Sequence, residues 1–110
     1  MNKLAKDILM AAAMRGQKQT YEMYEDEEGL CALGVLGFRF NQSDAAREGL
    51  KKRFALRSNV EDVACPECGR SGEERAAAAQ QISLLVHLND DHRFDFLTIA
   101  NKMPLVVDER

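Results

Sequence analysis

The stretch from Cys65 to His92 decides the fold, because it opens with C-P-E-C-G (65–69) and closes with H-L-N-D-D-H (87–92). Two cysteines separated by two residues precede two histidines separated by four, with eighteen residues between the pairs. Thiolates and imidazoles at such spacings supply the four ligands of a tetrahedral zinc ion. The sequence therefore predicts one structural zinc site, whose ligands are Cys65, Cys68, His87 and His92.

The residues between and beside these ligands suit a metal site. Pro66 fixes φ and stiffens the cysteine turn, while Gly69 permits the positive φ that usually follows it. The backbone N–H groups of such a turn point at the sulfurs. Asp90 and Asp91 follow the first histidine, and either carboxylate is placed to accept the second N–H of a ligand imidazole.

Two other interpretations of these residues stay open. Cys65 and Cys68 form a redox pair in thioredoxin-like proteins, but that arrangement expects a βαβ pattern, and none is visible around this C-x-x-C. Without a metal, His87 is a helix residue in a polar contact and His92 a surface residue. The pairing of both histidines with a C-P-x-C-G turn favours the metal site.

Length and composition indicate one soluble domain covering residues 1–110. The chain has 45% hydrophobic and 30% charged residues and a net charge of −3, so it is not a general binder of polyanions. No apolar run approaches the length of a membrane span, and residues 1–7 lack the features of a signal peptide. We expect a cytoplasmic protein in which the three cysteines are two ligands and one buried thiol, not disulfides.

Periodicity predicts a mainly α fold of four main helices and a short C-terminal helix, pinned by the zinc site. The expected ranges are 2–15, 30–38, about 44–57, 73–88 and 96–103. Ser43 and Asp95 are suitable N-caps, and Gly16 a suitable C-terminal stop. The connector 58–72 contains the cysteine turn, and Val60 and Val63 allow a very short extended piece there.

Spacing also predicts which helix faces are buried. In the first helix the expected face is formed by Leu4, Ile8, Ala11 and Ala12, with Ala5 and Leu9 beside it. In the third helix, Ala46, Leu50 and Phe54 share one face. In residues 73–88 the apolar stripe is Ala78, Ile82, Leu85 and Val86, and Asn89 is expected to end the helix in the left-handed conformation.

Residues 30–38 are apolar on every face, which predicts a buried central helix. Gly34 and Gly37 would let another helix approach it closely. Cys31 lies near its start, where the helix dipole lowers a thiol pKa, so catalysis by Cys31 with His87 as base is conceivable. A cysteine in an apolar helix is more often a small core residue, and we predict that Cys31 is structural.

Two charge clusters have a functional and a simpler interpretation. Glu22, Glu25, Asp26, Glu27 and Glu28 form an acidic run without the regular ligand spacing of a calcium loop, so we expect a solvated loop rather than a cation site or docking patch. A basic cluster follows in the third helix. It is either a solvated face or a strip for nucleic-acid phosphates, made by Lys51, Lys52, Arg53 and Arg57.

Two segments resemble those of small, mostly uncharacterised proteins of tailed bacteriophages and bacteria. The matches are C-A-L-G-V at 31–35, H-L-N-D-D-H at 87–92 and I-A at 99–100, and some members carry a C-P-x-C pair before the histidines, as at 65–68 here. The chain departs from the pattern at Phe94, where tryptophan is common, and after Ala100, where a D-W pair often follows. The resemblance implies a small accessory protein of phage type and no established activity.

These features together predict a non-enzymatic, zinc-stabilised interaction module with a protein partner. A nucleic-acid-binding regulator, using the basic third helix or the C-terminal helix, is the alternative. The apolar content and the opposed charge clusters also allow self-association into a homo-oligomer. A cysteine-dependent enzyme is a third, more distant, interpretation.

Overall fold

The computed structural model describes residues 1–21, 24–27, 29–56 and 63–105. Within them the chain is mainly helical, as the sequence predicts, and contains isolated β-bridges but no strand. None of the described helices combines the length and apolar character that spanning a membrane requires. The elements are α1 (Lys3–Met14), α2 (Ala32–Val35), α3 (Asp44–Arg53), α5 (Gly72–Ala77), α6 (Leu84–Val86), the π-helical turn η1 (His87–Asp91) and α7 (Phe96–Lys102).

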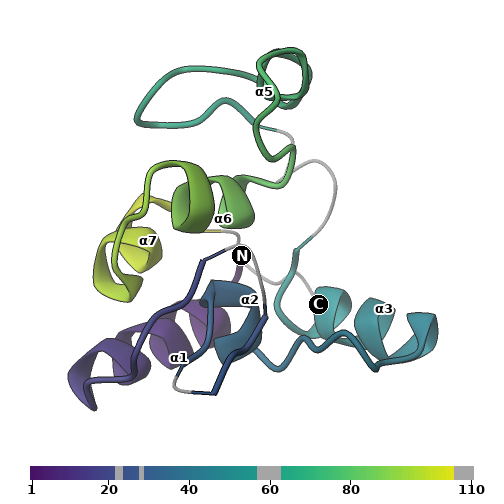
Figure 1. Cartoon of the computed structure of the whole chain (residues 1–110), viewed down its shortest axis with the longest axis vertical. Coiled ribbons are helices and arrows are strands. Elements are labelled where there is room, and N and C mark those ends of the chain that lie inside the picture. The colour runs from purple at the N-terminus through teal and green to yellow at the C-terminus, as the bar shows by residue number, and fades with distance from the viewer. Residues whose placement is uncertain (22–23, 28, 57–62, 106–110) are drawn as a thin grey trace.

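The helices are arranged around an apolar centre, with one part of the chain standing apart. Helices α1 and α7 lie side by side, and α6 with η1 continues over α2 (Figure 1). Helix α3 lies at the edge of the molecule, and α5 sits with the cysteine turn above α6. The buried apolar residues come mainly from α1, the α2 region, α6–η1 and α7. They include Met1, Ala5, Leu9, Ala32, Leu36, Phe38, Leu84, Leu85, Leu88, Phe96, Ile99 and Met103.

Helix α1 begins and ends with the caps its sequence supplies. The Asn2 side chain accepts a hydrogen bond from the Ala5 N–H at 3.0 Å, and Gly16 follows the helix with a φ of +72°. The predicted buried face is rotated, however. Ala5, Leu9 and Ala12 are the buried residues, and Leu4 is 44% exposed, because α7 packs on the Ala5 side of the helix.

The predicted helix over residues 30–38 is mostly wrong. Only Ala32–Val35 is helical, and Gly37 leaves the helix with a φ of +106°. The close approach expected at Gly34 does occur, but with an extended segment and not a helix: a Cβ on Gly34 would lie 2.0 Å from the Tyr24 carbonyl oxygen. The prediction of burial holds for Cys31, which is 7% exposed, and for Leu36 and Phe38.

The single helix predicted over residues 73–88 is also wrong. Helix α5 ends at Ala77, Ala79 takes a φ of +58°, and Ser83 caps a new helix by accepting the Val86 N–H. Ile82 from the expected stripe is 51% exposed, and Ala78 is exposed too. The reason is a side-chain contact: the buried Arg75 guanidinium takes the Gln81 and Ile82 carbonyls, which a continuous helix would use internally.

Two other helices follow their caps. Ser43 accepts the Ala46 N–H at the start of α3, and Asp95 accepts the Thr98 N–H at the start of α7. Helix α3 ends at Arg53, four residues before the predicted end, because Ala55 turns with a φ of +54°. Phe54 is buried and Leu50 half-buried, whereas Ala46 is exposed. Arg57 and Val60 lie outside the described residues.

Candidate metal centre

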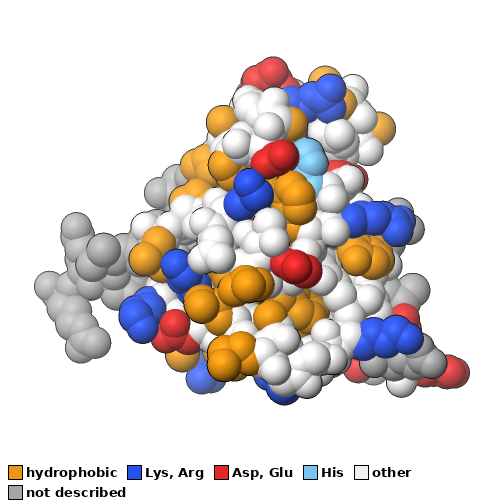
Figure 2. Space-filling view, turned by 90° about the vertical axis from the view of Figure 1, so that its left-hand side faces the viewer, with side chains coloured by type: hydrophobic (Ala, Val, Ile, Leu, Met, Phe, Trp, Pro, Cys, Tyr) orange, Lys and Arg blue, Asp and Glu red, His pale blue; other side chains and the backbone are white. Residues whose placement is uncertain are grey.

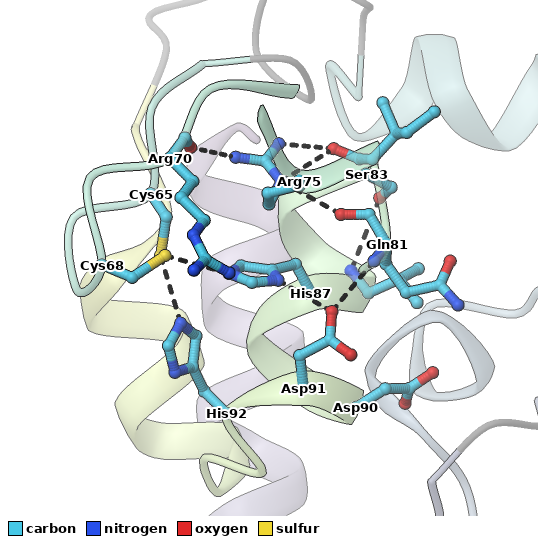
Figure 3. Close-up of polar contacts among 12 residues, drawn as sticks. Cys65, Cys68, Arg70, Arg75, Gln81, Ser83, His87, Asp90, Asp91 and His92 are labelled. Carbon is cyan, nitrogen blue, oxygen red and sulfur yellow. Dashed lines mark hydrogen bonds and ion pairs between the residues drawn. The ribbon is translucent and has the colours of Figure 1, made fainter. Parts of the chain in front are cut away.

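The structure brings the four predicted ligand residues together. One ligand atom from each of Cys65, Cys68, His87 and His92 lies within 4.8 Å of the other three. The Cys65 Sγ is 3.5 Å from His92 Nε2, and the Cys68 Sγ is 3.5 Å from His87 Nε2. In Figure 3 the four side chains converge from the cysteine turn and from η1 onto one point. Two thiols and two imidazoles in this arrangement could bind a metal ion.

The cysteine turn has the backbone that its sequence predicts. The Gly69 N–H bonds the Cys65 carbonyl at 2.8 Å, and Gly69 has a φ of +76°. The Glu67 N–H donates to the Cys65 Sγ at 3.4 Å, so a backbone N–H of the turn points at this sulfur, as expected. Cys65 is a buried residue and Cys68 an exposed one, although the Sγ atoms of both point to the histidines.

The two histidines reach the same point because the helix widens between them. In an α-helix, residues five apart point about 140° away from one another. Here residues 87–91 form a π-helical turn, and the His92 N–H bonds the His87 carbonyl at 3.1 Å. Such a turn returns to nearly the same face after five residues. The H-x4-H spacing therefore fits this local geometry, which the sequence analysis did not predict.

Of the two carboxylates, Asp91 holds the ligand imidazole. Its Oδ2 lies 2.8 Å from His87 Nδ1 and also accepts the Gln81 N–H at 2.9 Å. This contact leaves Nε2 of His87 as the atom that faces Cys68. Asp90 does not join the cluster: its Oδ1 accepts from the Asn89 side chain at 2.7 Å, and in Figure 3 it points away from the ligands.

The two histidines differ in burial and in their neighbours. His87 is fully buried, and this burial lowers its pKa, with the hydrogen bond to Asp91 opposing the shift. The neutral imidazole that a metal needs is thereby favoured. His92 stacks on Phe94 with ring centroids 5.3 Å apart. Because His87 is buried, the histidine edge visible at the surface in Figure 2 belongs to His92.

An ion pair ties the cysteine turn to α7. Lys102 Nζ lies 2.9 Å from a Glu67 carboxylate oxygen and 5.3 Å from the Phe94 ring centroid. The hydrogen bond from Lys102 lowers the pKa of the exposed Glu67 carboxyl. The pair thus lies next to Phe94, the ring on which His92 stacks.

Arg75 is a supporting residue that the sequence analysis missed. It is fully buried, and its guanidinium bonds the carbonyls of Val63, Arg70, Gln81 and Ile82. These carbonyls flank the cysteine turn on both sides and precede α6. The S-x-x-E pattern of Ser71 and Glu74 marked the helix start, since these residues form a capping box, but nothing local marked Arg75 as buried.

Asn89 was assigned the wrong role. It does not end a helix in the left-handed conformation, which Arg93 adopts instead at a φ of +56°. The Asn89 side chain is buried, and it accepts the Ala32 N–H and donates to the Thr20 carbonyl, both at 3.0 Å. The H-L-N-D segment is therefore joined directly to the start of the C-A-L-G helix.

The remaining candidate residues lie outside the cluster. Burial raises the pKa of the Cys31 thiol, whose Sγ accepts the Gly34 N–H at 3.4 Å, an arrangement that favours a structural cysteine. Lys51, Lys52 and Arg53 are exposed on α3. In the acidic run, Glu25 pairs with Arg39 at 3.3 Å and Asp26 accepts the Gly29 N–H, while Glu22 and Glu28 are outside the described residues.

Comparisons with protein-family models, curated proteins and solved structures found no match.

Proposed function

We propose that this protein is a zinc-stabilised, non-enzymatic interaction module. The observation that carries the proposal is the convergence of two thiols and two imidazoles on one point. A zinc ion held by four protein ligands has no position left for a water or a substrate, which is the mark of a structural site. The metal would then fix the fold, and a surface of the fold would bind a protein.

The distances support zinc as the metal. Zinc–sulfur bonds of about 2.3 Å and zinc–nitrogen bonds of about 2.0–2.1 Å, at a tetrahedral angle, separate a sulfur and a nitrogen by about 3.6 Å. Both closest sulfur–nitrogen distances are 3.5 Å. A direct S–H···N hydrogen bond would explain one such distance, but not the mutual approach of all four atoms.

We place the protein in the cytoplasm of a bacterial host, as an accessory protein of phage type that modulates a protein partner. The resemblance of residues 31–35 and 87–92 to phage and bacterial proteins motivates this setting. A reducing compartment suits it, because the cysteines must remain thiolates to hold a metal.

Native mass spectrometry of protein purified without chelator tests the proposal. We expect one zinc per chain in the parent protein. The Cys68→Ser variant and the His87→Gln variant should each lack it. The same spectra report the number of subunits and so test self-association. Protein that carries no zinc, or that carries zinc equally in the parent and both variants, would contradict it.

A nucleic-acid-binding regulator is the second candidate, and α3 favours it. None of the ten residues of α3 is buried, and Lys51, Lys52 and Arg53 at its end are exposed. Phosphate binding by this strip would give an affinity for random duplex DNA that falls steeply with salt. Replacing the three basic residues of α3 with glutamine should remove that affinity. The double variant Lys3→Gln, Lys6→Gln on α1 should keep it.

A further inference from the structure

A pocket of about 380 Å³ is lined in part by Asp90 of η1, and none of the four candidate metal ligands belongs to its lining. Its lining is apolar and aromatic except for Gln81 and the carboxylate of Asp90. The residues that the argument uses are Tyr24, Phe40, Leu33, Val86, Cys31 and Asp90, and the cavity is called the Asp90 pocket below.

The charge of the Asp90 pocket comes from Asp90. No lysine or arginine belongs to the lining, and burial keeps Cys31 a neutral thiol. Among the described residues no cation pairs with Asp90, whose carboxylate accepts from the Asn89 side chain. Since Asp91 and not Asp90 holds His87, the metal centre does not use this carboxylate.

The walls suit a flat cation. The Tyr24 and Phe40 rings lie 4.6 Å apart with planes inclined by 39°. Phe40 is 65% exposed, so its ring is accessible to a ligand. A guanidinium stacks on aromatic rings and bonds a carboxylate through two N–H groups, which a lysine ammonium does not do.

A second pocket beside the Asp90 pocket indicates where the neighbours of a bound side chain would lie. A smaller pocket of about 160 Å³ adjoins the Asp90 pocket, because Tyr24, Leu33 and Val86 line both. Arg47 and Lys51 line this second pocket and not the Asp90 pocket, and the Arg47 guanidinium lies 6.0 Å from the centroid of the shared Tyr24 ring. An apolar passage between the two would accept the residues that flank a bound basic side chain.

We propose that the Asp90 pocket binds an arginine side chain of a protein partner, with apolar neighbours of that arginine on Leu33 and Val86. The guanidinium would bond Asp90 and stack on Tyr24 and Phe40. This inference rests on the proposed function as an interaction module and names the chemistry of its partner. Arginine and aromatic residues are enriched at the centres of such interfaces.

An NMR titration of the ¹⁵N-labelled, zinc-loaded full chain tests the proposal. The probe is acetyl-Ala-Leu-Arg-Leu-Ala-amide, and its control replaces arginine with citrulline, a neutral group of the same shape. We expect saturable shifts of the Leu33, Val86 and Asp90 amides, with at least tenfold weaker binding of the citrulline peptide. Equal affinities, shifts confined to other regions, or no binding at millimolar peptide would overturn the proposal.

Variants separate the pocket from general charge effects. Asp90→Asn should weaken arginine-peptide binding at least tenfold, while Asp7→Asn on α1, an equal loss of charge far along the chain, should leave it unchanged. If Asp90→Asn fails to fold, Phe40→Ala replaces it, with an expected three- to tenfold loss. Full affinity in the folded variants would overturn the proposal. Metal content of the same samples shows separately whether the zinc-stabilised module exists.

Discussion

At the scale of single residues, the neighbouring carboxylates of Asp90 and Asp91 lie in different surroundings because of the π-helical turn. Asp91 contacts both His87 Nδ1 and the Gln81 N–H, so it orients a ligand and ties it to the loop before α6. Asp90, one residue earlier, faces an aromatic pocket. The sequence could not separate them, because that distinction depends on the π-helical turn.

This pair gives a matched test of the metal centre. We expect Asp91→Asn to lower metal affinity by about 10- to 100-fold, because a partner that orients a ligand imidazole contributes by that amount. Asp90→Asn should leave the affinity within about twofold of the parent. Competition with a zinc chelator measures both. Equal loss in the two variants would mean that Asp91 has no special role.

Glycines allow a second residue-scale test. Gly34→Ala would place a Cβ 2.0 Å from the Tyr24 carbonyl oxygen, a backbone contact that no side-chain movement relieves. We expect it to lower the free energy of unfolding by at least about 3 kcal/mol. Gly49→Ala, within α3, meets nothing within 4 Å and should raise it by about 0.5–1 kcal/mol. Urea denaturation of the metal-loaded proteins measures the difference, and similar values would contradict the close approach.

At the scale of elements, local signals predicted the caps and tertiary contacts decided the rest. Ser43, Asp95 and Gly16 mark helix ends by chemistry that acts within a few residues. In residues 73–88, by contrast, the local sequence predicts the wrong structure. Their alanines favour a helix, but the buried Arg75 guanidinium takes the carbonyls of Gln81 and Ile82, a side-chain contact that helix propensity and periodicity do not show.

Arg75 is therefore expected to stabilise the segment that carries the cysteine turn. Arg75→Met keeps the apolar stem and leaves the carbonyls of Val63, Arg70, Gln81 and Ile82 without their shared donor. The expected loss is about 3 kcal/mol or more in the free energy of unfolding, together with weaker metal binding. Arg70→Met, at an exposed position in the same segment, serves as the control. A loss below about 1 kcal/mol for Arg75→Met would contradict this role.

At the scale of the whole molecule, the sequence predicted the helical class and the residues of the candidate site better than the helix boundaries. Cysteine and histidine spacing identifies ligands because few other roles require it. The burial of Arg75 and Asn89 could not be predicted, since polar side chains are buried only where distant backbone groups satisfy them. The rotated face of α1 likewise depends on where α7 packs.

The structure divides into two parts that should respond differently to metal loss. One is the apolar centre made by α1, α2, α6 and α7, which buries residues such as Leu9, Leu84, Leu88 and Ile99. The other, residues 63–82, contains the cysteine turn and α5, and α5 has no extensive contact with another described helix. Apart from the candidate metal ligands, its polar ties to the rest of the described chain include the Gln81 N–H bond to Asp91 and the Glu67–Lys102 pair, whereas the Arg75 bonds lie within it.

Chelation should therefore release residues 63–82 and leave the apolar centre folded. Hydrogen exchange after EDTA treatment is expected to show a loss of protection at the amides of Gly69, Arg75 and Ala78, with α1 and α7 still protected. The helices would persist because α7 packs on α1 through Ile99 and Ala100 rather than through the ligands. His92→Ala should reproduce this pattern of protection. In EDTA-treated protein, the same substitution should cause no further loss of protection. If α7 loses protection as fast as α5, the metal instead holds the whole fold together.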